Sequence, residues 1–327
     1  MSPRRTPNPK GTMTTTTEPA VKPKPKQRPG DRWFSGTALF AGSMILVTLA
    51  AVALFLIVQS IPGLTATSET ASLLPGNFWQ YVWPLAFGTI WASFLALLMA
   101  VPLSVAVALF ISHYAPRRLA QGLGYIVDLL AAVPSVVFGL WGILVLAPAV
   151  QPVYAWLTAN AGWFPLFSGT ASATGRSIFT AAIVLAVMVT PIITAICREI
   201  FLQTPVLHEE AALALGATRW EMIRMAVFPF GRSGIVSASM LGLGRALGET
   251  MAVAMVLSAT GVVTFRLFTS ENPSTIPANI ALTFPEAYGV NINVLIATGL
   301  ILFIVTFAVN ALARYIVSRR KEFSGAN

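Results

Sequence analysis

The chain has 327 residues, of which 56% are hydrophobic and only 10% are charged. Soluble domains carry roughly 25% charged residues, so this composition excludes the soluble globular class and indicates a polytopic membrane protein. The single cysteine, Cys197, excludes an internal disulfide, and two histidines leave little material for a metal centre. The net charge of +9 would suit a nucleic-acid binder only if it formed a patch, and its distribution along the chain does not.

Residues 1–35 differ from the rest of the chain because they are rich in Pro, Thr and Lys and have almost no large apolar side chain before Trp33. Such a segment buries too little surface to offset its chain entropy. We expect a disordered cytoplasmic tail. The apolar run that follows is too long for a signal peptide and lacks a clear cleavage site.

Six apolar segments are long enough to span a bilayer core about 30 Å thick, which takes roughly 20 helical residues. We expect a first transmembrane helix with its outer loop over 36–83, a transmembrane domain over 84–314, and a cytoplasmic C-terminal tail over 315–327. The predicted spans are 36–61, 84–112, 122–150, 177–197, 234–263 and 290–313.

The positive charges predict the orientation, since Lys and Arg gather in cytoplasmic loops. Eight lie in the N-terminal tail, two in the loop 113–121, four in the loop 198–233 and four at the C-terminal end. Only Arg176 and Arg266 lie on the other side, and Arg245 lies inside a span. Both termini are therefore expected in the cytoplasm, and the excess charge reflects topology.

The longest internal cytoplasmic loop holds the stretch EEAALALGATRWEMIRMAVFPFG at 209–231. Thr204-Pro205 is typical of a helix start, with proline in the first helical position. Gly216 suits the left-handed residue after a helix. Thr218 and Glu221 fit a capping box that opens a second helix, and Pro229 is expected to stop that helix. The prediction is helix, sharp turn, helix.

Two interpretations of this insert are open. It could be an amphipathic helix lying on lipid, or a protruding pair that inserts into a groove of a protein partner. A lipid-bound helix explains neither the bend nor Glu209-Glu210 beside an anionic leaflet. The apolar face of the second helix is predicted to hold Trp220, Ile223 and Val227, with Arg219, Glu221 and Arg224 mostly opposite.

The insert resembles the EAA loop of ABC importer permeases. Glu210, Ala211, Ala212, Gly216 and Pro229 stand at the family's spacing. The resemblance implies a type I ABC importer permease (MetI-like) fold, all-α and integral to the membrane, with this loop as the coupling helix that docks onto a separate ATPase. This chain has no Walker A sequence, G-x-x-x-x-G-K-[ST], so ATP and Mg²⁺ are expected on that partner, with no cofactor bound here.

The stretch GRALGETMAV at 244–253 carries two charges inside the fifth span. Arg245 and Glu249 are expected four residues apart on one helix face, with Arg245 near the membrane midplane. A charge at that depth is costly and typically faces a pathway. Gly244 and Gly248 would allow close helix approach. One interpretation is a structural ion pair; the other is an arginine that attracts an oxyanion, since its planar fork of donors suits one.

This stretch, with DLLAAVPSVVFGLWG (128–142) and WPLAFGT (83–89), resembles the PstC-type permeases of phosphate importers. The resemblance implies Arg245 and Glu249 in phosphate passage, and Ser135 could also face the path. Asp128 is interpreted as a helix-end or packing residue, and His113 and His208 as solvated loop residues. The implied location of this chain is the bacterial plasma membrane. The implied partners are a second, PstA-type permease, an ATPase dimer and an extracytoplasmic phosphate-binding protein.

Other functions stay open at this point. A permease of the same fold could carry sulfate, molybdate or a peptide. A polytopic membrane enzyme would need a nucleophile with its base, an Asp dyad or a metal site, and no HExxH or GxGD sequence occurs. A stand-alone channel or sensor would leave the cytoplasmic helix pair without a purpose.

Overall fold

The computed structural model describes residues 29–321 as an all-helical chain, apart from two isolated bridges that join Thr67 to Asn77 and Ala259 to Asn272. Six of the described helices are long and apolar enough to cross a membrane, which confirms the predicted number. These segments are Trp33–Leu64, Phe78–Tyr114, Ser135–Ala161, Ile178–Leu202, Arg219–Leu247 and Val290–Tyr315.

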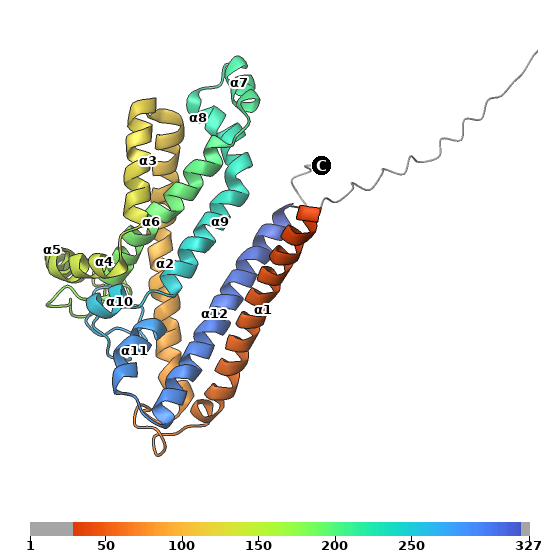
Figure 1. The fold of residues 1–327 in the computed structure, drawn as a ribbon. Helices are drawn as coiled ribbons and strands as arrows, with labels where there is room; N and C mark the ends of the chain where they lie inside the picture. Colours follow the sequence, from red (N-terminus) through yellow and green to blue (C-terminus); the bar gives the residue numbers. More distant parts are fainter. Residues whose placement is uncertain (1–28, 322–327) are drawn as a thin grey trace, which may run out of the picture. The chain divides into compact units, whose positions relative to one another are not determined.

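The order of elements follows from the apolar runs and the capping residues between them (Figure 1). Asn77, for example, caps the second helix by accepting a hydrogen bond from the backbone N–H of Gln80 at 3.0 Å. The α-helices are α1 Pro29–Leu64, α2 Phe78–Leu109, α3 Arg117–Ala131, α4 Ser135–Trp141, α5 Ala147–Ala161, α6 Ile178–Leu202, α7 Val206–Ala214, α8 Arg219–Met222, α9 Phe228–Leu247, α10 Met251–Val256, α11 Ile276–Thr283 and α12 Val290–Lys321. Short turns of other helix types are η1 Phe110–Tyr114, η2 Gly142–Leu146, η3 Ile223–Val227 and η4 Phe284–Glu286.

The chain divides into two compact units, one that ends at Val52 and one that begins at Ala53. In the first part, the described side chains from Trp33 to Val52 are exposed, as on a helix surrounded by lipid. Because α1 begins at Pro29, the prediction of a disordered tail is wrong for residues 29–35. The rest of that prediction concerns residues that lie outside the described ones.

The core of the second part forms where α2 and α9 pack against α6. Along α2, Ala92, Ala96 and Ala100 are fully buried at intervals of four residues. Small side chains let helix backbones approach closely, and in a bilayer this packing replaces the hydrophobic driving force between helices. α6 is the central helix, since most of its side chains are buried.

Glycine allows α9 to lie against α6. A Cβ at Gly242 would lie 2.7 Å from Cδ1 of Ile193, and one at Gly231 would lie 2.9 Å from the ring of Phe201. The predicted close approach at Gly244 and Gly248 is wrong for this chain, because a Cβ at Gly244 would meet nothing within 4 Å. That edge of α9 is open.

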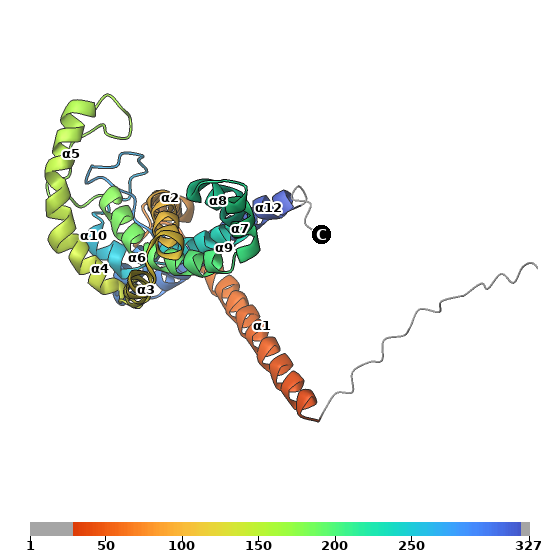
Figure 2. The same cartoon turned by 90° about the horizontal axis from the view of Figure 1, so that it is seen from above.

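The third predicted span, 122–150, is not one straight helix. α3 packs along α6, whereas α4 and α5 lie across the direction of α2 and α6 (Figure 1, Figure 2). The interruption at 132–134 falls at Pro134, which lacks a backbone N–H and disfavours helical angles at the residue before it.

Candidate functional site

An open groove of about 1160 Å³ lies between α9 and α12. Its wall is mainly apolar, with Ile192 of α6 and Phe303 and Phe307 of α12 among the lining side chains. α9 runs toward the end of the bundle that carries α11, and α12 runs away from it (Figure 1). The polar and small lining residues are Ser237, Gly244 and Arg245 from α9, and Thr306, Asn310 and Arg314 from α12.

Arg245 lies in the last turn of α9, which ends at Leu247. Its side chain is exposed in this groove and makes no ion pair with any side chain that the structure describes. The negative end of the helix dipole favours a cation in the last turn. An unpaired guanidinium within an apolar span is nevertheless costly unless it faces a water-filled path or a counter-charge. The geometry leaves this arginine free to attract an anion.

Glu249 does not share a helix face with Arg245, so the prediction of an i, i+4 pair on one continuous helix is wrong. Residues 248–250 interrupt the fifth span, and α10 begins at Met251. Glu249 is 7% exposed, and its Oε1 accepts a hydrogen bond from the backbone N–H of Ala252 at 3.2 Å. The carboxylate therefore stabilises the positive end of α10. Broken helices of this kind line binding sites in many transporters.

Ser135, the third predicted pathway residue, lies elsewhere. It is the first residue of α4, half-buried, and it does not line the groove. α4 packs against α10. The structure therefore brings neither Ser135 nor Glu249 into the groove that holds Arg245.

The helix pair in the long loop has the predicted bend. Gly216 has a φ of +86°, a left-handed conformation that side chains other than glycine rarely adopt. The capping box is present: the backbone N–H of Thr218 donates to Glu221 Oε2 at 2.8 Å, and the Thr218 hydroxyl accepts from the Glu221 N–H at 3.3 Å. One detail differs at the start, because Pro205 is the cap itself and α7 begins at Val206.

Pro229 does not stop the second helix, and that prediction is wrong. The π-helical turn η3 precedes it, in which the N–H of Phe228 bonds to the carbonyl of Ile223, five residues back. A regular turn would bring the proline ring against the carbonyl of Met225, four residues back, and the wider turn relieves this crowding. α8 therefore continues through η3 into α9. α8 and the helix that carries Arg245 are one continuous helical segment.

The exposed surface of the pair is more apolar than predicted. Ile223 and Val227 are fully buried as expected, but Trp220 is 55% exposed. Leu207 and Leu215 are exposed at 76% and 89%. These side chains lie at the end of the bundle that carries α7 and α8, opposite α11 (Figure 1). Leu207 and Leu215 lie outside the candidate membrane spans and Trp220 lies at the very start of one. An apolar surface that protrudes at this end is typical of a protein interface.

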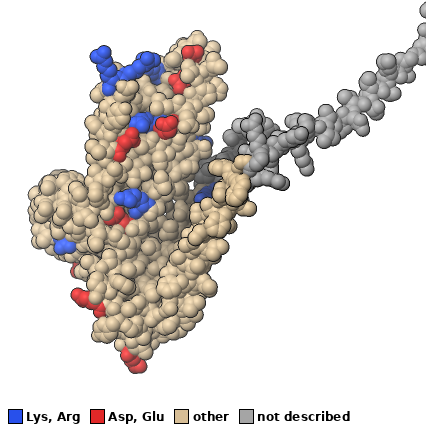
Figure 3. Space-filling view, in the orientation of Figure 1, with Lys and Arg blue, Asp and Glu red and all other residues tan. Residues whose placement is uncertain are grey.

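The residues of the EAA pattern lie on and beside this pair. Glu210 and Ala211 of α7 are exposed, and Ala212 is buried at 8% exposure. Charged side chains are visible at this end, whereas most of the face in Figure 3 is uncharged, as a lipid-facing surface requires.

The interpretation of His113 as a solvated loop residue is wrong. Its side chain is 9% exposed and its Nε2 lies 3.4 Å from Oε1 of Glu209 in α7. Its Nδ1 lies 2.7 Å from the hydroxyl of Ser112. η1, which continues α2, is thereby tied to α7. The two residues are 96 positions apart, so no local pattern indicated the contact. His208 is exposed, as predicted.

Asp128 has the packing role expected of it. Its Oδ2 lies 3.7 Å from Nη2 of Arg198 in α6. Gly124, one helical turn before Asp128, makes room for this arginine, because a Cβ there would collide with its guanidinium. The pair joins α3 to α6, and neither residue lines the groove.

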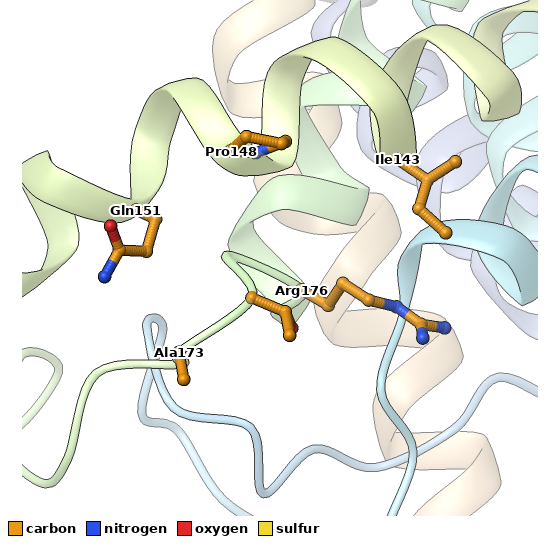
Figure 4. A pocket seen from close by; sticks show the side chains of 6 residues that line it. Ile143, Pro148, Gln151, Ala173 and Arg176 are labelled. Atoms are coloured by element: carbon orange, nitrogen blue, oxygen red, sulfur yellow. The ribbon is translucent and has the colours of Figure 1, made fainter.

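A smaller pocket of about 470 Å³ contains Arg176 but is not built around it. The guanidinium points away from Gln151, toward the side on which Ile143 lies (Figure 4). Its Nη2 donates to the carbonyl of Leu257 at 3.2 Å. Leu257 caps α10, so Arg176 stabilises the negative end of that helix.

The known proteins that this chain resembles are components of membrane transport systems. A family model described as "Binding-protein-dependent transport system inner membrane component" matches residues 100–322. The chain is 47% identical over 323 residues to the phosphate transport system permease protein PstC 2 of Mycobacterium bovis, covering 92% of this chain and 97% of that one. The identity to the phosphate transport system permease protein PstC of Mycobacterium leprae is 43%, covering 89% and 94%. A chain in the crystal structure of a bacterial alginate ABC transporter shares the fold, with a TM-score of 0.54 and 17% identity, covering 89% of this chain and 98% of that chain.

Proposed function

Since this chain belongs to the family of binding-protein-dependent transport system inner membrane components, the permease subunits of ABC importers, we propose that it is the PstC-type permease of an importer for inorganic phosphate. It is a multi-pass protein of the inner membrane and a transport component, not an enzyme. The substrate proposed is the one that the names of its relatives give. ATP hydrolysis belongs to a partner subunit.

Arg245 is the observation that supports an anionic substrate most directly. It is a cation without a counter-charge among the described residues, it lies at a break in a membrane span, and it opens onto a groove. A planar guanidinium binds tetrahedral oxyanions through paired donors. A second permease, of the PstA type, would close the open side of the groove, and the exposed edge at Gly244 offers it a place to approach.

Glu249 acts on this site indirectly. Its carboxylate stabilises the start of α10 and so fixes the position of the break beside Arg245. Ser135 does not line this groove, so it would face the path only in another state of the transporter.

The helix pair of α7 and α8 is the proposed contact with the ATPase dimer. Its exposed Leu207, Leu215 and Trp220 suit insertion into an apolar groove of a partner. The continuous helix through η3 would carry closure of the ATPase to α9 and Arg245. The distribution of Lys and Arg along the sequence supports an orientation with α7 and both termini in the cytoplasm, and a phosphate-binding protein on the opposite side.

The test is uptake of labelled phosphate by proteoliposomes that contain the whole complex, normalised to assembled protein. Sulfate and molybdate serve as competitors. Arg245→Lys keeps the charge and loses the fork of donors, so we expect poor transport with normal assembly. Replacing Arg245 and Glu249 together by apolar residues of similar size should abolish uptake. Near-normal uptake by that double variant would overturn the proposed role of Arg245 in the path. Full competition by sulfate would overturn phosphate as the proposed substrate.

A further inference from the structure

The groove contains a second unpaired arginine, Arg314, on α12. Like Arg245, it is exposed and has no ion-pair partner among the described side chains. Arg314 follows Asn310 and Thr306 at intervals of four residues, so the three side chains lie on one helix face. All three line the groove. Their spacing along the axis is about 6 Å.

The two arginines lie toward opposite ends of the groove. α9 and α12 run in opposite directions (Figure 1), and Arg245 and Arg314 are the most C-terminal lining residues of their helices, so they lie toward opposite ends of the groove. Ser237 and Arg245 are separated by about 12 Å along α9, and Phe303 and Arg314 by about 16 Å along α12. Arg314 lies in the part of α12 that leads toward the end of the bundle with α7 and α8.

Between the arginines, the groove offers hydrogen-bond donors. Thr306 and Asn310 are half-buried in an otherwise apolar helix. Among the described residues of α12 up to Arg314, the side chains of Asn291, Asn293 and Thr298 form hydrogen bonds, whereas those of Asn310 and Arg314 form none. A hydroxyl and an amide can each donate to an oxyanion. Conduction is favoured by several weak sites at short steps over one strong site.

We propose that Arg314, with Asn310 and Thr306, forms a second oxyanion site where the transported anion leaves the groove for the cytoplasm. The proposal rests on the proposed function, because it takes the groove as the path of an inorganic phosphate. Arg314 holds the anion after Arg245 releases it, and the donors of Asn310 and Thr306 bridge the interval. The same chemistry would suit the phosphate of a lipid headgroup, and the orientation rule alone also puts arginines at cytoplasmic helix ends. The experiment separates these sources.

The first arm compares Arg314→Gln with Arg232→Gln in proteoliposomes that contain the full complex. Arg232 is exposed on α9 and does not line the groove, so its variant removes the same charge outside the proposed path. We expect Arg314→Gln to lower the maximal rate of phosphate import at least about five-fold without changing the half-saturating concentration, because capture on the outer side is unaltered. Arg232→Gln should stay within about two-fold of wild type, and Arg314→Lys should recover part of the rate.

The second arm places a cysteine in the groove with Asn310→Cys. The natural Cys197 is fully buried and should stay unreactive. An anionic methanethiosulfonate reagent should modify Cys at this position faster than a cationic one, and inorganic phosphate should slow the anionic reagent. Adding Arg314→Gln should remove the preference, whereas adding Arg232→Gln should not. The measurement is made in vesicles of phosphatidylcholine alone and in vesicles that also contain phosphatidylglycerol.

Protection by inorganic phosphate in both lipid compositions supports the site. Protection that is absent, with a reactivity that follows the phosphatidylglycerol content, would assign Arg314 to a lipid headgroup and overturn it. Equal import rates in Arg314→Gln and Arg232→Gln would also overturn it. If the wild-type complex imports phosphate normally but Arg314→Gln changes neither the import rate nor the labelling at position 310, this inference alone is refuted. If the wild-type complex imports no phosphate, the proposed function is refuted.

Discussion

The turn at Gly216 gives the sharpest test of the coupling role. Gly216→Val puts a β-branched side chain at a φ of +86°. A Cβ there would meet nothing within 4 Å, so we expect backbone strain to be the main effect. That strain is about 1–2 kcal/mol for a left-handed residue. It corresponds to a shift of roughly 5- to 30-fold in the population of the bent form.

The matched control is Gly289→Val. Gly289 also has a positive φ, +58°, and a Cβ there would meet nothing within 4 Å. It lies next to the start of α12, at the other end of the bundle from α7 and α8 (Figure 1). The two variants should therefore lose similar stability, and only Gly216→Val should impair coupling. Gly216→Asn should be nearly normal, because asparagine tolerates this conformation.

The assay is the ratio of ATP hydrolysed to phosphate imported by the reconstituted complex, measured beside the fraction of complex that assembles. We expect Gly216→Val to raise this ratio several-fold, or to lower assembly with the ATPase, and Gly289→Val to leave it near wild type. A Gly216→Val complex that assembles fully and keeps the wild-type ratio would refute the view that this bend is the joint between ATPase and membrane helices.

Four further predictions use other parts of the chain. His113→Ala and Glu209→Gln should each weaken coupling about two- to three-fold, since a hydrogen bond of this kind contributes roughly 0.5–1.5 kcal/mol and 3.4 Å is long for one; the double variant should lose no more than either single one, and additive losses would show that the two side chains act separately. Gly242→Ala should lower the thermal stability of the complex because of the contact with Ile193, whereas Gly244→Ala should leave the isolated chain unchanged in a thermal unfolding assay. Glu249→Ala should lower the free energy of unfolding by about 0.5–2 kcal/mol because a helix cap is lost. Glu249→Gln should change the transport rate more than assembly. A Glu249→Ala complex as stable as wild type would show that the cap does not stabilise the protein. Deleting residues 1–28 should leave uptake unchanged because their composition provides no packing surface, and loss of uptake by an inserted protein would contradict this.

Several features of the chain follow from local chemistry and were predictable from the sequence. Six apolar runs determine the number of spans, since backbone groups in lipid must be satisfied within a helix. The left-handed Gly216 and the capping box of Thr218 with Glu221 depend on residues within three positions of each other. The membrane class and the bent cytoplasmic insert were therefore accessible without any tertiary information.

The tertiary structure decided how those elements are interrupted and joined. Pro229 is a stop signal by its own chemistry, yet a π-helical turn absorbs it and keeps α8 and α9 continuous. Arg245 and Glu249 are four residues apart, as in an i, i+4 pair, but the helix is interrupted at 248–250. Arg245 therefore lines the groove, whereas Glu249 caps the start of α10. The contact of His113 with Glu209 and the shared groove of Arg245 with Arg314 join residues far apart in the chain. Packing between helices sets these relations, because which faces meet depends on the shapes of distant side chains that no local pattern contains.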